Sequence, residues 1–153
     1  MSKSKRKKNT KEDDLVFLRN IVDNKKIGIH EIDEFSQISY PLFSFKWFNI
    51  KNAEKCSDPK YFISYLSRLH KLSQLGWEGI RTSPRHCYGM EKIPVKKIKI
   101  KNLPDIVTPD VQYLDVLRAV EDNRPMVGLQ QGKIFHVFFL ETYFGDVYDH
   151  GCK

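Results

Sequence analysis

Hydrophobic and polar positions alternate most clearly in the second half of the chain. Three runs rich in β-branched and aromatic residues, at positions 114–120, 125–129 and 134–140, are separated by short turns that contain Asp, Asn or Gly. Runs of strand length between such turns predict an antiparallel meander of three strands. The last run, IFHVFFL, is apolar apart from His136, so we expect it to lie inside the sheet with both of its faces covered.

Helical spacing of apolar residues marks the main helix. Asp58 is a favourable N-cap, and Pro59 fits the first helical turn because its missing N–H would have no partner there. We expect the helix to run from Asp58 to Leu75 and to end at Gly76. We expect its buried stripe to consist of Phe62, Tyr65, Leu66, Leu69 and Leu72. We expect its outer face to carry Lys60, Ser64, Arg68 and Lys71.

The N-terminal region is first basic and then amphipathic. Residues 1–11 carry six Lys and Arg residues and no acid, and we expect a segment of this composition to be disordered over residues 1–10. Leu15, Leu18 and Val22 then recur at helical spacing, which predicts a helix over residues 11–23. We therefore expect a basic tail over residues 1–10 and a single α+β domain over residues 11–153.

A dense aromatic run at residues 42–48 predicts a further strand, with Phe43, Phe45 and Trp47 on one face. Together with the meander and the main helix, this run indicates an α+β fold. We expect an antiparallel sheet of four to five strands packed against one main helix, plus the N-terminal helix.

Residues 95–101 alternate as a strand does, with Ile98 and Ile100 on the inner side. Lys97, Lys99 and Lys101 are then expected to point outward. A lysine row of this kind either protects an edge strand from aggregation or follows a phosphate backbone. The sequence leaves both interpretations open.

Composition restricts the class of protein. With 153 residues, of which 41% are hydrophobic, the chain suits one domain with a modest core. No apolar run is long enough to cross a bilayer, and no apolar segment follows the charged N-terminus, so we expect a soluble, cytoplasmic protein with no membrane partner. The cysteines, Cys56, Cys87 and Cys152, are too few and too scattered for a secreted disulfide framework.

The net charge of +7 is unevenly distributed along the chain. Residues 81–101 carry seven basic residues against Glu91 alone, whereas residues 102–153 carry eight acids against four bases. This polarity favours a polyanion that meets one face of the protein.

Side chains able to cleave RNA gather near the C-terminus and in one loop. Cleavage needs no metal when a base takes the proton of the 2′-hydroxyl group, cations stabilise the charge on the phosphate, and an acid protonates the departing oxygen. Histidine suits these proton transfers, and arginine suits the phosphate. The candidate residues are Tyr148, Asp149 and His150, together with Arg118, Arg124, Arg85 and His86.

The C-terminal part of the chain contains, in this order, an arginine-bearing strand, a glycine-containing strand, IFHVFFLE and VYDH. This order resembles the C-terminal half of the RelE/ParE toxin superfamily. Tyr148, Asp149 and His150 are similar to the C-terminal catalytic cluster of its HigB type. The resemblance implies a toxin of a toxin–antitoxin system. Such a protein is an endoribonuclease that cleaves messenger RNA on the ribosome, without a cofactor or metal, and has an antitoxin protein as a partner.

The resemblance also implies that Arg118 and Arg124 contact phosphate and that His86 belongs to the site. The full set of expected RNA-binding residues is Arg81, Arg85, His86, Lys97, Lys99 and Lys101. ParE-like members share the fold and act on gyrase without cutting RNA, and a fold does not determine an activity. The alternative is therefore a noncatalytic nucleic-acid-binding or gyrase-inhibiting module that uses the same basic face.

Two metal sites are disfavoured by the sequence. His86 and Cys87 with His150 and Cys152 offer zinc-binding atoms, but adjacent side chains on an extended chain point apart. A magnesium nuclease needs carboxylates on rigid strand ends, and the available acids lie mainly in loops. These acids are Asp105, Asp110, Asp115, Glu121 and Asp122.

Overall fold

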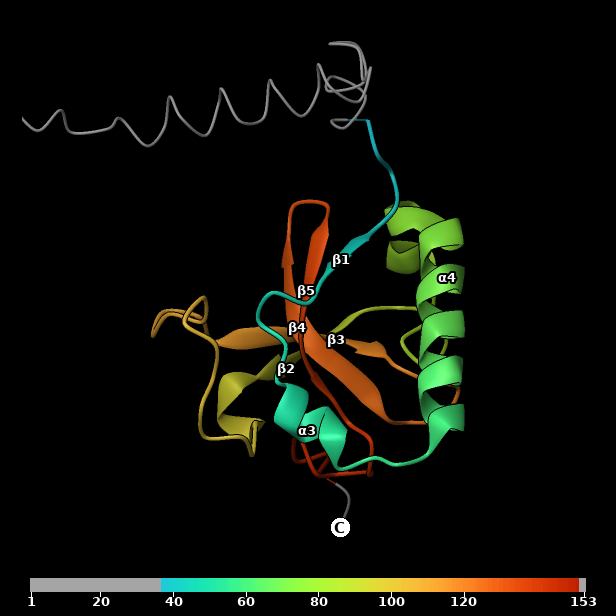
Figure 1. The fold of residues 1–153 in the computed structure, drawn as a ribbon. Coiled ribbons are helices and arrows are strands. Elements are labelled where there is room, and N and C mark those ends of the chain that lie inside the picture. The colour runs from blue at the N-terminus through green and yellow to red at the C-terminus, as the bar shows by residue number, and fades with distance from the viewer. Residues whose placement is uncertain (1–36, 152–153) are drawn as a thin grey trace, which may run out of the picture. The chain divides into compact units, whose positions relative to one another are not determined.

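A computed structural model describes residues 37–151, and the expected meander is present within them (Figure 1). Its strands are β3 (Tyr113–Arg118), β4 (Pro125–Gln131) and β5 (Ile134–Leu140), and each pairs antiparallel with the next. The basic tail expected over residues 1–10 and the helix expected over residues 11–23 lie outside the described residues, as does the expected domain boundary between them.

Two short strands extend the meander to a five-stranded sheet. β1 (Leu42–Ser44) and β2 (Glu91–Pro94) form its edges, and the strand order is β1-β5-β4-β3-β2. β2 is antiparallel to β3, whereas β1 is parallel to β5, so the sheet is mixed and not wholly antiparallel. A parallel pair needs a long crossover connection, and here the intervening helices and strands supply it. The α+β class with one main helix is confirmed.

Both faces of β5 are covered, as its apolar sequence predicts. Phe138 and Phe139 both pack into the core on one face of the sheet. They share this face because Val127 pairs with Phe139 and Gly128 pairs with Val137, which leaves Phe138 as a bulge. A Cβ atom at Gly128 would lie 1.9 Å from a backbone oxygen of β5, so the close approach of these strands requires glycine there.

The strand expected at residues 42–48 ends early. β1 stops at Ser44, and a short helix that the sequence did not predict, α3 (Ile50–Glu54), follows after a turn. Phe43 and Trp47, expected on one face, pack into the cores on opposite faces of the sheet. The strict alternation of a strand is lost because the chain turns between them.

α3 is held to β5 through backbone groups. The side chain of Asn49 caps the helix, and the backbone N–H of Asn49 donates to the carbonyl of the bulged Phe138 at 2.8 Å. The buried side chain of Asn52 accepts the backbone N–H of Leu140 at 3.1 Å. The bulge and the short helix therefore satisfy each other's polar groups, which a strand pattern in the sequence does not reveal.

The main helix, α4 (Pro59–Thr82), begins as expected, with Asp58 as its N-cap. Gly76 ends the first part of the helix, since its φ of 73° lies in the left-handed region. Residues 77–82, which lie beyond the expected end of the helix, form a second helical part after this kink. No helix among residues 37–151 combines the length and the apolar character that crossing a bilayer requires.

The buried face of α4 differs from the expected one. Tyr61, Tyr65, Arg68 and Leu72 are buried, whereas Leu66, expected inside, is 60% exposed. Arg68 can face inward because its guanidinium donates to two backbone carbonyls, at 3.2 and 3.1 Å. A buried cation is tolerated when its donors are satisfied in this way.

Arg68 connects α4 to two other segments. Its acceptors are the carbonyl of Cys87, in the loop after α4, and the carbonyl of Val120, in the turn after β3. The guanidinium also stacks on the ring of Tyr88, 4.6 Å from the ring centroid. Arg68 therefore holds this loop and this turn against the helix.

Residues 95–101 do not form the expected strand. After β2 the chain makes one 3-10 turn, η1 (Val95–Lys97), and Ile98 then forms an isolated bridge with Tyr148. The expected sidedness is nevertheless right, because Ile98 and Ile100 pack into the core while the lysines at positions 97, 99 and 101 are exposed. The alternation reflects an extended segment that docks onto the core outside the regular sheet.

The structure predicts a large stability role for Arg68. Replacement of Arg68 by Met keeps an unbranched apolar stem but removes the guanidinium and leaves two carbonyls without a donor, so the free energy of unfolding should fall by about 2–4 kcal/mol. Urea unfolding measures this change. The control is Arg81→Met on the same helix, where the exposed pair with Glu78 should contribute less than about 1 kcal/mol. Equal losses in the two variants would contradict the assignment.

Candidate functional site

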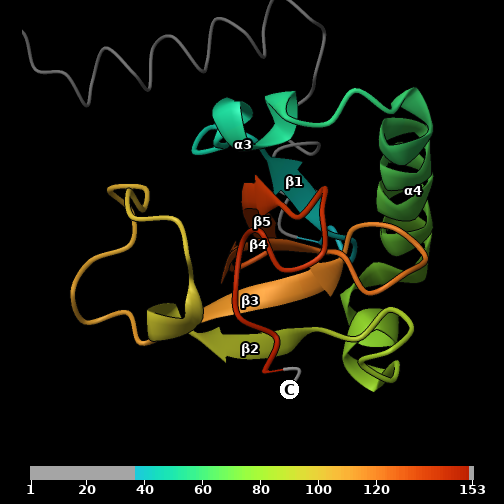
Figure 2. The same ribbon diagram turned by 90° about the horizontal axis from the view of Figure 1, so that it is seen from below.

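After β5 the chain crosses back over the sheet toward β2 (Figure 2). A cavity of about 260 Å³ is lined in part by this returning segment. This C-terminal segment, residues 141–151, is joined to the segment after β2 by the bridge between Tyr148 and Ile98. The cavity lies on the sheet face opposite α4, because Val116 lines it and packs into the core that contains no α4 residue. Its lining comprises Arg85, His86, Gly89, Glu91, Val116, Arg118, Asn123, Pro125, Phe144, Tyr148 and His150.

His150 is the most constrained titratable residue of the cavity. Its Nε2 atom lies 2.5 Å from Oε1 of Glu141. Its ring lies between two aromatic rings, with centroid distances of 4.1 Å to Phe144 and 3.9 Å to Tyr148. The side chain is 11% exposed, so its orientation is set by three contacts while it still reaches the cavity.

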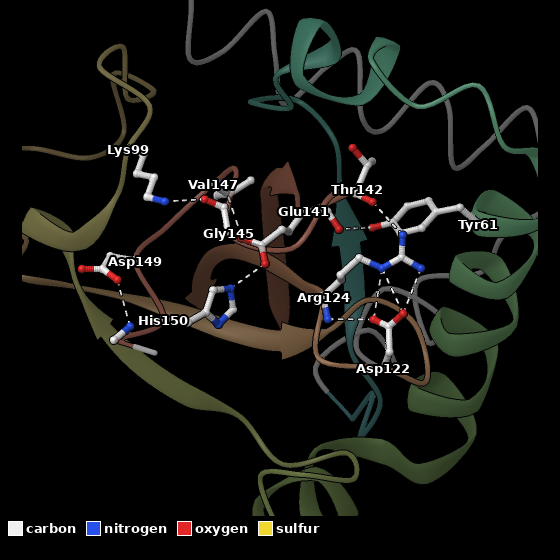
Figure 3. Close-up of polar contacts among 11 residues, drawn as sticks. Tyr61, Lys99, Asp122, Arg124, Glu141, Thr142, Gly145, Val147, Asp149 and His150 are labelled. Carbon is white, nitrogen blue, oxygen red and sulfur yellow. Dashed lines mark hydrogen bonds and ion pairs between the residues drawn. The ribbon is translucent and has the colours of Figure 1, made fainter. Parts of the chain in front are cut away.

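Glu141 is fully buried and joins four segments (Figure 3). Besides His150, its carboxylate accepts the backbone N–H of Val147 at 3.3 Å. Its backbone carbonyl accepts the hydroxyl of Tyr61 at 3.0 Å, and its backbone N–H donates to the carbonyl of Pro125 at 2.9 Å. The buried carboxylate is thereby paired with an imidazole and a backbone donor, as a charge in a protein interior must be.

The contact with Glu141 determines the proton positions on His150. An ionised carboxylate only accepts hydrogen bonds, so the Nε2 atom of His150 carries the hydrogen in this contact. In the neutral ring the Nδ1 atom is then the one that can take up a proton. A histidine held in one tautomer by a buried acid is the arrangement that general base catalysis uses.

Two arginines and a second histidine form the other side of the cavity. Nη2 of Arg118 lies 3.1 Å from Nδ1 of His86, and Nε of Arg85 lies 3.2 Å from its Nε2. A neutral imidazole has one acceptor nitrogen, so only one guanidinium donates to the ring at a time. Nε of Arg85 also lies 3.3 Å from Oε1 of Glu91. The guanidinium groups thus keep donors for an anion in the cavity.

The structure does not bring Arg124 into this cavity. Arg124 forms a two-pronged pair with Asp122, donates to the carbonyl of Thr142 at 2.6 Å, and stacks over Tyr61 at 4.8 Å (Figure 3). The hydrogen bond with Asp122 raises the pKa of Arg124. Its observed contacts therefore anchor the turn between β3 and β4 to α4 and to the end of β5.

Asp149 also lies apart from the cavity lining. Its carboxylate (Figure 3) accepts the backbone N–H of Gly151 at 2.9 Å. The backbone N–H of Asp149 donates to the carbonyl of Lys97. Among the expected RNA contacts, Arg85 and His86 line the cavity, whereas Arg81 pairs with Glu78 on α4. The three lysines of that expected set, Lys97, Lys99 and Lys101, are exposed and lie outside the lining.

Sequence reasoning missed Glu141 and Phe144. The signal for Glu141 was its position, directly after an apolar strand whose faces are both covered, where an acid needs a partner. Phe144 carried no such signal, because its role depends on the return of the C-terminal segment over the sheet. Within residues 37–151, no three His, Cys, Asp or Glu side chains group as a metal site would require; Cys152, part of the zinc alternative, lies outside this range.

Comparisons of the chain with family models, with curated proteins and with solved structures find no match.

Asp146 is a half-buried acid near the site. Both oxygens of its carboxylate are buried and have no hydrogen-bond partner within the described part of the chain. Burial, and then the nearby charge of Glu141, raise the pKa of Asp146 above its ordinary value of 3.8. The folded protein therefore binds this proton more tightly than the unfolded chain does.

This shift has a direct consequence for stability. Because the folded-state pKa of Asp146 is raised, its contribution to stability falls as the pH rises from about 3.8 through that raised value. Asp146→Asn should therefore unfold at a higher urea concentration than the wild type at pH 7, and this advantage should shrink as the pH falls toward 3.8. The control is the exposed Asp105→Asn, which should change neither the urea concentration of unfolding nor its dependence on pH. A less stable Asp146→Asn protein at pH 7 would contradict the shift.

Proposed function

We propose that the chain is an endoribonuclease that cleaves RNA through attack of the 2′-hydroxyl group on the adjacent phosphate, without a metal. One observation carries the proposal: His150, oriented by the buried Glu141, lines the same cavity as Arg118, Arg85 and His86. A base held in one tautomer and two guanidinium groups facing one space are the groups that this reaction requires.

The proposed steps follow from these groups. Nδ1 of His150 takes the proton of the 2′-hydroxyl, and the 2′-oxygen forms a bond to phosphorus. Arg118 and Arg85 donate hydrogen bonds to the phosphate oxygens, whose charge grows in the transition state. The bond from phosphorus to the 5′-oxygen then breaks and that oxygen takes a proton from a water molecule. The proton held by Nδ1 of His150 passes to the hydroxide that remains, which restores the base. The products are a 2′,3′-cyclic phosphate and a 5′-hydroxyl end.

The biological setting in this proposal is that of a toxin of the RelE/ParE superfamily. The resemblance of the C-terminal half supports it, and three features are compatible with it: the meander, the α+β class, and the position of Tyr148 and His150 in one cavity. The substrate would be messenger RNA in the cytoplasm, free or on the ribosome, and an antitoxin protein would restrain the enzyme. Growth arrest on expression, relieved by a protein encoded by a neighbouring gene, tests this part.

A second function is a module that binds nucleic acid or gyrase and does no chemistry. The observation that favours it is the low exposure of the His150 side chain, 11%, between two aromatic rings. A histidine packed in this way also occurs as a structural residue. The two functions differ in one measurement, because only the first yields a 2′,3′-cyclic phosphate.

Replacement of the base tests the proposed enzyme. His150→Ala should lower kcat/KM for a defined RNA by about 10²- to 10⁴-fold, the usual contribution of a positioned acid or base. Cleavage of labelled RNA by the full-length protein, with and without ribosomes, measures this loss. The matched control is His70→Ala, an exposed histidine of α4 outside the cavity, which should cleave at the wild-type rate. Full activity of His150→Ala would overturn the proposed mechanism.

Glu141 acts through His150 and is therefore a positioning residue. Glu141→Gln keeps the shape of the side chain but removes the charge that fixes the tautomer, so kcat should fall by up to about 10⁴-fold, the loss that follows when the acid orienting a catalytic histidine is replaced by its amide. KM should change little, because Glu141 does not line the cavity. The exposed Glu54→Gln serves as the control. A change in KM alone would assign Glu141 a different role.

A further inference from the structure

The aromatic rings around His150 form a column with two different ends. Phe144, His150 and Tyr148 stack in this order, and the ring planes of Phe144 and His150 meet at 22°. At one end Tyr148 packs against the core that contains Val116 and Phe139. At the other end Phe144 is 52% exposed. The column is therefore anchored in the protein at Tyr148 and open to solvent at Phe144.

Phe144 is half exposed although it stacks on His150. One face of its ring is covered by the imidazole of His150, yet about half of the residue remains accessible. An apolar ring in solvent gains nothing for folding from that exposed half. The same ring also lines the cavity that holds Arg85 and Arg118. An apolar stacking surface thus lies beside an anion-binding surface.

We infer that the exposed face of Phe144 is a stacking platform for one nucleobase, and that the substrate is single-stranded RNA. This inference rests on the proposed function, because it places a phosphate of the RNA in the cavity. A base next to that phosphate continues the aromatic column on the open side of Phe144. A base in a duplex has both faces covered by its neighbours, so only an unpaired base can stack there.

The size of the cavity suits a group smaller than a whole nucleotide, such as its phosphate, with the base outside on Phe144. Its volume of about 260 Å³ is below the roughly 300–1,000 Å³ of pockets that enclose drug-sized ligands. Stacking on Phe144 recognises the ring face that all four bases share, so the platform contributes affinity and strand selectivity more than base selectivity.

The experiment measures binding without cleavage. The probe is a short single-stranded 2′-O-methyl RNA, which lacks the attacking hydroxyl, and a series of the same strands with one abasic site moved along the sequence. For the wild-type protein, one abasic position should weaken binding by about 5- to 150-fold, the usual effect of losing one stacked base. A duplex of the same sequence should bind more weakly than the single strand.

Variants then locate the stacking surface. Phe144→Leu should weaken binding of the intact strand by a similar factor, and the sensitive abasic position should then cause no further loss, since the same contact is already gone. Phe144→Trp should keep the affinity and the abasic effect. The control is Tyr143→Leu, a neighbouring aromatic residue that is 56% exposed but does not line the cavity; it should bind as the wild type does.

The outcomes separate this inference from the proposed function. An equal abasic effect in the wild type and in Phe144→Leu, equal binding of duplex and single strand, or no binding of the strand would overturn the platform, even if RNA is cleaved in a His150-dependent manner. Coupled losses in a protein that never cleaves RNA would support the platform and overturn the nuclease.

Discussion

The site depends on one constraint: a carboxylate that folding places in the core must find partners there. Glu141 follows directly on β5 and has no exposed surface. An unpaired charge in such a place is strongly unfavourable, so the chain must supply donors. Val147 and His150 supply them from the C-terminal segment, which therefore returns over the sheet. The need to satisfy one buried acid thus brings the final histidine into the cavity.

Two arginines supply hydrogen-bond donors to backbone carbonyls elsewhere in the molecule. Arg68 and Arg124 direct donors at backbone carbonyls of loops and strand ends, and each stacks on a tyrosine. Carbonyls at such positions have no partner in a helix or sheet, and the planar guanidinium can reach several of them at once. These contacts hold the loop with Arg85 and the turn after Arg118, so that the cationic wall of the cavity is built on fixed segments.

Local patterns predicted the elements whose causes are local. The meander, the N-cap at Asp58 and the break in the helix at Gly76 were foreseen because turn residues, capping and a left-handed backbone act over a few positions. The expected end of the helix at Gly76 was wrong, because α4 resumes after it and runs to Thr82. The buried face of α4 was wrong for a different reason. A hydrophobic pattern predicts that Leu66 is buried and Arg68 exposed. Arg68 is buried instead because its guanidinium donates to two carbonyls of residues that are far away in sequence. The same holds for α3, whose backbone partner is the bulge in β5.

Sequence alone determined the α+β class, the strands near the C-terminus and the kinds of side chain available for chemistry, because periodicity and composition are properties of the chain itself. Only the tertiary structure decided which of these side chains meet. Arg118 reaches His86 and the cavity of His150, whereas Arg124, close to it in sequence, turns toward Tyr61 and Asp122. The two arginines separate because a tight turn lies between them, with Arg118 at the end of one strand and Arg124 just before the next. Which side chains meet in one site depends on the pairing of strands that are distant in sequence and on the partners that buried charges require. The local spacing of residues predicts neither of these.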